Sequence, residues 1–114
     1  MLQPGLKDEI LSALTENLKI YKVILFGSSA ADAAERDSDI DLIVVTDDDY
    51  IPRNYQENMR NYLNVSAVLR SIKAKIPVDL IVHTKPMHEK FIHLGSMFSK
   101  EVVKKGEVLY EKNN

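Results

Sequence analysis

The sequence predicts an α/β fold in which helices cover a small mixed β-sheet. Three observations lead to it: short β-branched apolar runs, stretches of helical apolar spacing between them, and connections that are mostly short. The chain has 114 residues, of which 45% are hydrophobic, and this is enough for one modest core. We therefore expect a single domain over residues 1–114.

The first half of the chain alternates helical and strand patterns. Residues 6–18 carry leucines and isoleucine three or four positions apart, which predicts an amphipathic helix. Residues 21–26 predict a buried strand that stops at the turn 27–29. The alanine-rich residues 30–36 predict a short helix, and residues 39–45 predict a second strand that opens with two acids.

The second half continues the alternation. Residues 55–75 predict one long helix with a single apolar face, and residues 78–83 predict a third strand. A helical stretch then begins at Pro86, and Gly106 suits its C-terminal cap. Residues 108–110 are expected to form a last edge strand or a hook that packs on the sheet.

Three aspartates occur at or near the starts of predicted apolar strands, where charged side chains are unexpected. Asp39 and Asp41 are two positions apart on one strand, so their side chains project from the same face, roughly 7 Å apart at the backbone. Asp79 stands near the start of another apolar strand. Any one of these acids could simply form an Asx-type turn or end a strand. Together they are unfavourable unless a cation lies among them, which predicts a site for Mg²⁺ or Mn²⁺.

Zinc fits the sequence poorly. The three histidines, His83, His88 and His93, are spaced five residues apart, and five helical steps rotate away from one face. There is no cysteine to supply a thiolate or a disulfide.

The turn Gly27–Ser28–Ser29 is a candidate phosphate-binding element. It follows a predicted strand and precedes a predicted helix, so it offers backbone amides and hydroxyls to a phosphate. A Gly-Ser pair after a strand is more often only a tight turn. The Asp-x-Asp strand ten residues downstream is what favours the functional interpretation, because metal ligands would then lie beside a phosphate cradle.

Residues 27–45, GSSAADAAERDSDIDLIVV, resemble the glycine-serine, spacer, Asp-x-Asp signature of the nucleotidyltransferase superfamily related to DNA polymerase β. Asp79 in PVDLIV matches the third carboxylate of that family. The resemblance implies a nucleotidyltransferase-like α/β sandwich. It also implies that Asp39, Asp41 and Asp79 are catalytic and metal-binding, and that Gly27, Ser28 and Ser29 hold phosphates.

The short chain also resembles the minimal nucleotidyltransferases, which are often encoded beside a helical HEPN-domain protein. This resemblance implies an antitoxin that moves AMP from ATP onto a tyrosine of a HEPN ribonuclease toxin. Many relatives read Gly-Ser-x-Ala-Arg-Gly, whereas this chain has Asp32 in place of the second glycine. Two alternatives therefore stay open: a non-catalytic antitoxin that acts by complex formation, and a small-molecule nucleotidyltransferase.

Composition limits the partners of the chain. The net charge is −2 and the basic residues are scattered, so we expect no direct nucleic-acid binding. No stretch approaches eighteen apolar residues, so we expect no membrane partner and a cytoplasmic location. A homo-oligomer is compatible with the sequence. Val65, Val68, Met87, Met97 and Phe98 fit core packing better than a docking surface for the acceptor.

Overall fold

The structure is a computed structural model that describes residues 2, 4–27 and 39–113. In this part of the chain, helices and strands alternate as the sequence predicts. Their order is α1 Pro4–Asn17, β1 Ile20–Phe26, β2 Ile40–Thr46, α2 Tyr55–Val68, α3 Arg70–Lys73, β3 Val78–Thr84, α4 Lys85–Leu94, α5 Met97–Lys105 and β4 Glu107–Glu111. The predicted short helix at residues 30–36 lies outside the described residues, as do Ser28 and Ser29.

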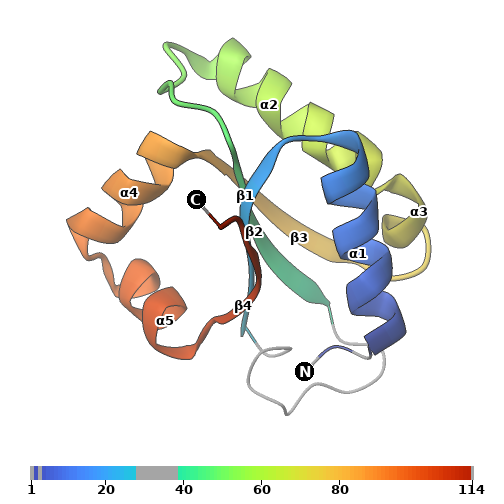
Figure 1. Cartoon of the computed structure of the whole chain (residues 1–114). Helices are drawn as coiled ribbons and strands as arrows, with labels where there is room; N and C mark the ends of the chain where they lie inside the picture. The colour runs from blue at the N-terminus through green and yellow to red at the C-terminus, as the bar shows by residue number, and fades with distance from the viewer. Residues whose placement is uncertain (1, 3, 28–38, 114) are drawn as a thin grey trace.

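The four described strands form one mixed sheet with the order β3-β2-β1-β4. β1 is antiparallel to both β2 and β4, whereas β2 and β3 are parallel. The sheet lies between two layers of helices, with α1, α2 and α3 on one face and α4 and α5 on the other (Figure 1). The predicted fold class is confirmed. The last segment forms the edge strand β4 rather than a hook.

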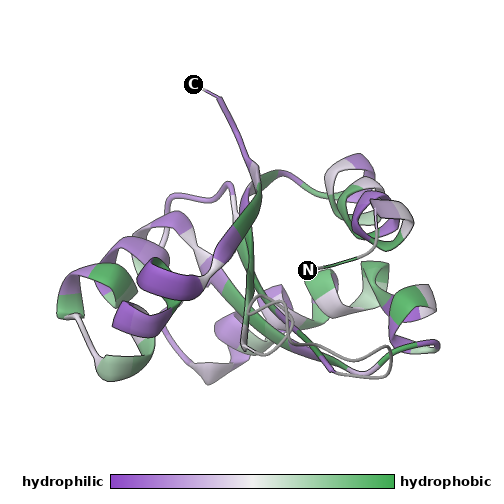
Figure 2. Cartoon of the chain, turned by 90° about the horizontal axis from the view of Figure 1, so that it is seen from below, coloured by the Kyte–Doolittle hydropathy of each residue, from purple (hydrophilic) through white to green (hydrophobic). Residues whose placement is uncertain are grey.

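Each face of the sheet has its own core. Alternate residues of the central strand β2 point to opposite faces, so a continuous apolar run is buried on both sides. Leu42 and Val44 pack with Ile10 and Leu14 of α1, whereas Ile43 belongs to the smaller cluster beneath α4 and α5. Figure 2 shows hydrophobic residues along much of the sheet, whereas the end of the last strand, toward the C-terminus, is hydrophilic.

Two predicted helices are each divided into two. The helix predicted at 55–75 is interrupted at Leu69, whose φ of −96° and ψ of 8° are not helical, and α3 follows as a short separate helix. The stretch after Pro86 is interrupted at Gly95, which adopts a left-handed φ of 63°. Ser96 then caps α5 by accepting a hydrogen bond from the Ser99 amide. Apolar periodicity continued through both breaks and concealed them.

Candidate functional site

Topology brings two of the predicted acids side by side. Asp41 is the second residue of β2 and Asp79 the second residue of β3, and the parallel register pairs them directly. Neighbouring strands are about 4.8 Å apart, so the two carboxyl groups are close. Asp41 shares its face of the sheet with Ile43, and this is the face that α4 and α5 cover.

The carboxyl groups of Asp41 and Asp79 act directly on each other. The pKa of Asp41 is raised from 3.8 to about 6 by burial together with a hydrogen bond to Asp79 and the negative charges of Asp79 and Asp39, and burial is the largest of these causes. Because a hydrogen bond between two carboxyl groups requires a proton, the pair shares one below about pH 6 and loses it as the pH rises above this value. Every described charge that shifts the pKa of Asp41 is negative.

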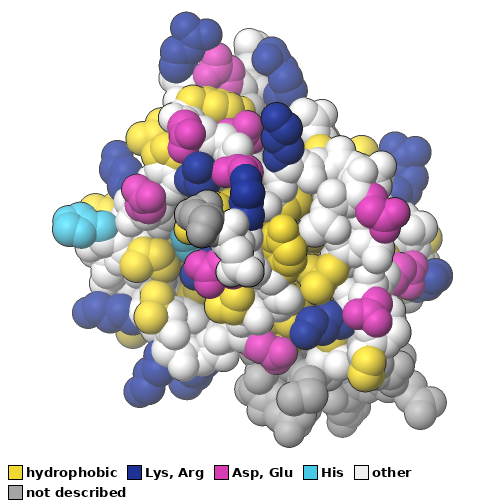
Figure 3. All heavy atoms as spheres, viewed as in Figure 1, with side chains coloured by type: hydrophobic (Ala, Val, Ile, Leu, Met, Phe, Trp, Pro, Cys, Tyr) yellow, Lys and Arg dark blue, Asp and Glu magenta, His cyan; other side chains and the backbone are white. Residues whose placement is uncertain are grey.

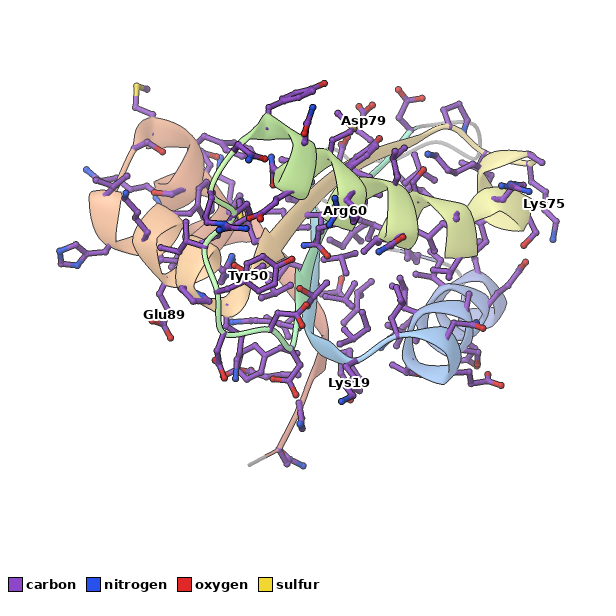
Figure 4. All side chains as sticks on the ribbon, turned by 90° about the horizontal axis from the view of Figure 1, so that it is seen from above. Lys19, Tyr50, Arg60, Lys75, Asp79 and Glu89 are labelled. Atoms are coloured by element: carbon purple, nitrogen blue, oxygen red, sulfur yellow. The ribbon has the colours of Figure 1, made fainter. Side chains whose placement is uncertain are left out.

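Asp39 precedes β2 and is exposed, and its charge reaches Asp41. Asp79 is also exposed and projects from the edge strand β3 (Figure 4). Within residues 2, 4–27 and 39–113, no three Asp, Glu or His side chains are gathered tightly enough to form a ready metal centre. Asp41 is the acid that relates the other two, because it pairs with Asp79 and the charge of Asp39 acts on it.

The acids at the opposite end of β2 provide an internal contrast. Asp47 contacts Lys85 at 3.0 Å and Lys112 at 2.5 Å, and hydrogen bonds to these two lysines lower its pKa. Lys85 also contacts Asp49 at 3.0 Å. At this end of β2, lysines compensate the charge of both acids. The surroundings of Asp41 suit an external cation with a preference for oxygen ligands, such as Mg²⁺ or Mn²⁺.

Gly27 is fitted to the Asp41 carboxylate. It follows β1, whose last residue Phe26 pairs with Asp41 across the sheet. Its φ is +76°, a left-handed conformation that favours glycine, and a Cβ at this position would overlap the Oδ2 atom of Asp41. The sequence singled out this glycine as part of a phosphate turn. The structure adds that glycine is also required for the close approach of the turn to an acid.

Two of the three histidines, His83 and His88, lie side by side, whereas His93 lies apart from them on the surface. Nδ1 of His83 and Nδ1 of His88 are 3.1 Å apart, and both rings pack against Phe91. Burial lowers the pKa of both side chains, in the case of His88 to about 4 with the help of the charges of His83 and Lys22. These two rings are therefore neutral at physiological pH and form part of the packing beneath α4. His93 is exposed.

Of the five apolar residues expected in the core, Val65 is buried, whereas Met97 and Phe98 are not. Met97 is 88% exposed and Phe98 is 41% exposed. The expectation was wrong for these two residues, which lie in the first turn of α5. Sequence reasoning also missed that Phe98 lies against Phe26 and lines the same hollow as Gly27, since both depend on how α5 packs against the sheet.

Comparison with known proteins places the chain in a family. The family model described as "Polymerase beta, Nucleotidyltransferase" matches residues 8–114. The chain therefore belongs to the polymerase β nucleotidyltransferase family. No curated protein sequence gives a significant match to the chain.

Several crystal structures share the fold. One is a toxin–antitoxin complex with AMP-PNP. Its TM-score is 0.59, and the two sequences are 22% identical over an alignment that covers 94% of this chain and 74% of that chain. A mutant of the MntA–HpeT toxin–antitoxin also has a TM-score of 0.59, with 21% identity over 99% of this chain and 76% of that chain. A structure from Shewanella oneidensis has a TM-score of 0.57 and 15% identity over 97% and 74% of the two chains.

No helix in the described part of the chain has both the length and the apolar composition needed to cross a membrane. On the face seen in Figure 3, acidic and basic side chains are interspersed.

Proposed function

We propose that the chain, acting as one domain over residues 1–114, is a metal-dependent adenylyltransferase. It moves AMP from ATP to a hydroxyl group of a protein partner and thereby acts as the antitoxin of a HEPN-domain toxin. The observation that carries this proposal is the direct pairing of Asp41 with Asp79 beside Asp39. Membership of the nucleotidyltransferase family supports the reaction class, and the toxin–antitoxin complexes of similar fold support a protein partner.

The acids fit a divalent metal. A cation would take the place of the proton that Asp41 and Asp79 share below about pH 6, and at neutral pH it would relieve the repulsion among the three carboxylates. Asp39, Asp41 and Asp79 would hold the metal, which when bound would stabilise the negative charge that develops on the phosphates. Mg²⁺ and Mn²⁺ suit this role because they share their coordination between carboxylates and substrate phosphates.

In the proposed reaction, the acceptor hydroxyl oxygen attacks the α-phosphorus of ATP in line with the bond that breaks. A bond forms between this oxygen and the α-phosphorus, the bond from the α-phosphorus to the bridging oxygen breaks, and pyrophosphate leaves. Asp79 is exposed and can accept the hydroxyl proton and pass it to water. Gly27 and the residues that follow it hold the β- and γ-phosphates, while the rest of the site positions the two reactants.

The test is transfer of label from α-labelled ATP to a co-purified partner in the presence of Mg²⁺. The wild type is compared with the double variant Asp39→Asn/Asp41→Asn, in which label on the partner should vanish. A matched control, Asp8→Asn/Glu16→Gln, removes the same number of charges from exposed positions of α1 and should transfer normally. Transfer that persists in the Asp39→Asn/Asp41→Asn variant would show that these acids do not carry the reaction.

The same experiment addresses the second candidate, an antitoxin that acts by complex formation alone. The replacement of the second glycine of many relatives by Asp32 favours this candidate, because an acid that faced the triphosphate would repel it. If the wild type transfers no label, an adenylyltransferase assayed in parallel is active, and the Asp variants still neutralise the toxin, complex formation is the function.

A further inference from the structure

A largely apolar hollow of about 440 Å³ adjoins the candidate site. Phe26 and Gly27, at the end of β1, form one side of it. The other side is formed by α5, including Phe98, and by Gly106 directly after that helix. The hollow thus lies between the end of β1 and α5.

The walls of this hollow suit a flat aromatic group. The rings of Phe26 and Phe98 meet edge to face, with centroids 5.4 Å apart and an interplanar angle of 74°. Phe98 nevertheless remains 41% exposed, so part of its ring is available to a ligand. The charged residues of the lining are Glu101 and Lys105, which form an ion pair of 3.2 Å.

The hollow and the acids share Gly27. This glycine lines the hollow, and the space where its Cβ would stand is occupied by the Asp41 carboxylate. A group bound against Phe98 therefore lies next to the place where the phosphates meet the acids.

We propose that the hollow binds the nucleobase of the nucleoside triphosphate, stacked on the exposed part of Phe98. This inference rests on the proposed function. The edge of a nucleobase carries both hydrogen-bond donors and acceptors, which match the carboxylate of Glu101 and the ammonium group of Lys105. Every nucleobase has a π-face, so stacking supplies affinity for the nucleotide whatever its base.

The test compares binding of ATP with binding of inorganic tripolyphosphate, both with Mg²⁺, by isothermal titration calorimetry. The wild type should bind ATP more tightly than tripolyphosphate. Phe98→Ala should weaken ATP binding about tenfold, within the range that loss of one stacking partner produces, and should leave tripolyphosphate binding unchanged. Phe98→Leu keeps apolar volume for packing and should also weaken ATP binding. Met97→Ala, at the 88% exposed neighbouring position outside the hollow, is the matched control and should change neither affinity.

The outcomes separate this inference from the proposed function. Equal affinity of the wild type for ATP and tripolyphosphate would overturn the base site and leave metal-dependent phosphate binding intact. An unchanged affinity of Phe98→Ala for ATP, together with a raised KM for the protein acceptor, would assign the hollow to the acceptor and would also overturn it. If the folded wild type bound neither ligand, the proposed function itself would fail.

Discussion

Replacing Asp41 with asparagine should stabilise the metal-free protein at neutral pH. The folded state raises the pKa of Asp41 from 3.8 to about 6, so it binds this proton more tightly than the unfolded state does. The contribution of this tighter proton binding to the stability of the folded state is fully present below pH 3.8 and is lost as the pH rises through 6. A shift of about two pKa units corresponds to an upper limit of about 3 kcal/mol. Because Asp41 is only partly buried, solvent screening reduces the expected gain from Asp41→Asn to about 1 kcal/mol.

The assay is urea and thermal unfolding followed by circular dichroism, in EDTA, at several pH values from 4 to 7.5. The quantity to compare is the difference in unfolding free energy between Asp41→Asn and wild type. It should grow from near zero at pH 4 to about 1 kcal/mol at pH 7.5, or about 4 °C in the midpoint. The variant has to be compared with the wild type because His88 also makes the stability of both proteins depend on pH. The pKa of His88 is lowered from 6.5 to about 4, so its contribution to stability is lost as the pH falls from 6.5 toward 4, which is opposite to the trend from Asp41.

Two further results complete this test. Mg²⁺ should raise the unfolding midpoint of the wild type and leave that of Asp41→Asn nearly unchanged, because only the wild type has the carboxylate at this position. Glu16→Gln, at an exposed position of α1, should behave as the wild type at every pH. If Asp41→Asn were less stable than wild type at pH 7.5 without metal, the reasoning from repulsion among the acids would be refuted.

Two other predictions concern a glycine and a buried amide. Gly27→Ala should lose at least about 1 kcal/mol of stability because of its left-handed φ, and it should also lose Mg²⁺-dependent nucleotide binding because the added Cβ displaces the Asp41 carboxylate. Gly95→Ala is the control: its φ is +63° and no atom lies nearer than 3.7 Å to the added Cβ, so this variant should lose stability only. Equal nucleotide binding by the two variants in calorimetry would contradict this prediction. Asn61→Leu should raise the free energy of unfolding by about 1 kcal/mol, because the buried Nδ2 atom of Asn61 has no hydrogen-bond partner in the described structure; a lower urea midpoint would show that the amide is satisfied in solution.

The sequence was informative wherever a local pattern had one interpretation. Strands β1, β2 and β3 lie where β-branched runs predicted them, because such runs bury well on a sheet. Helix boundaries were less predictable. The breaks at Leu69 and Gly95 preserve the apolar periodicity on both sides, so only the backbone angles reveal them. The exposure of Phe98 was also outside the reach of periodicity, because it depends on how α5 packs against the sheet.

By itself, the sequence determined that Asp39 and Asp41 share one face of a strand, and that Asp79 opens another apolar strand. Only the tertiary structure decided that β3 lies parallel to β2 and in the register that sets Asp79 opposite Asp41. The physical reason is that strand pairing is a long-range interaction, and two helices separate β2 from β3 along the chain. Because successive side chains of a strand point to opposite faces, the position of Asp79 depends on the register to within one residue. A slip of one position would have turned Asp79 to the other face of the sheet, away from Asp41.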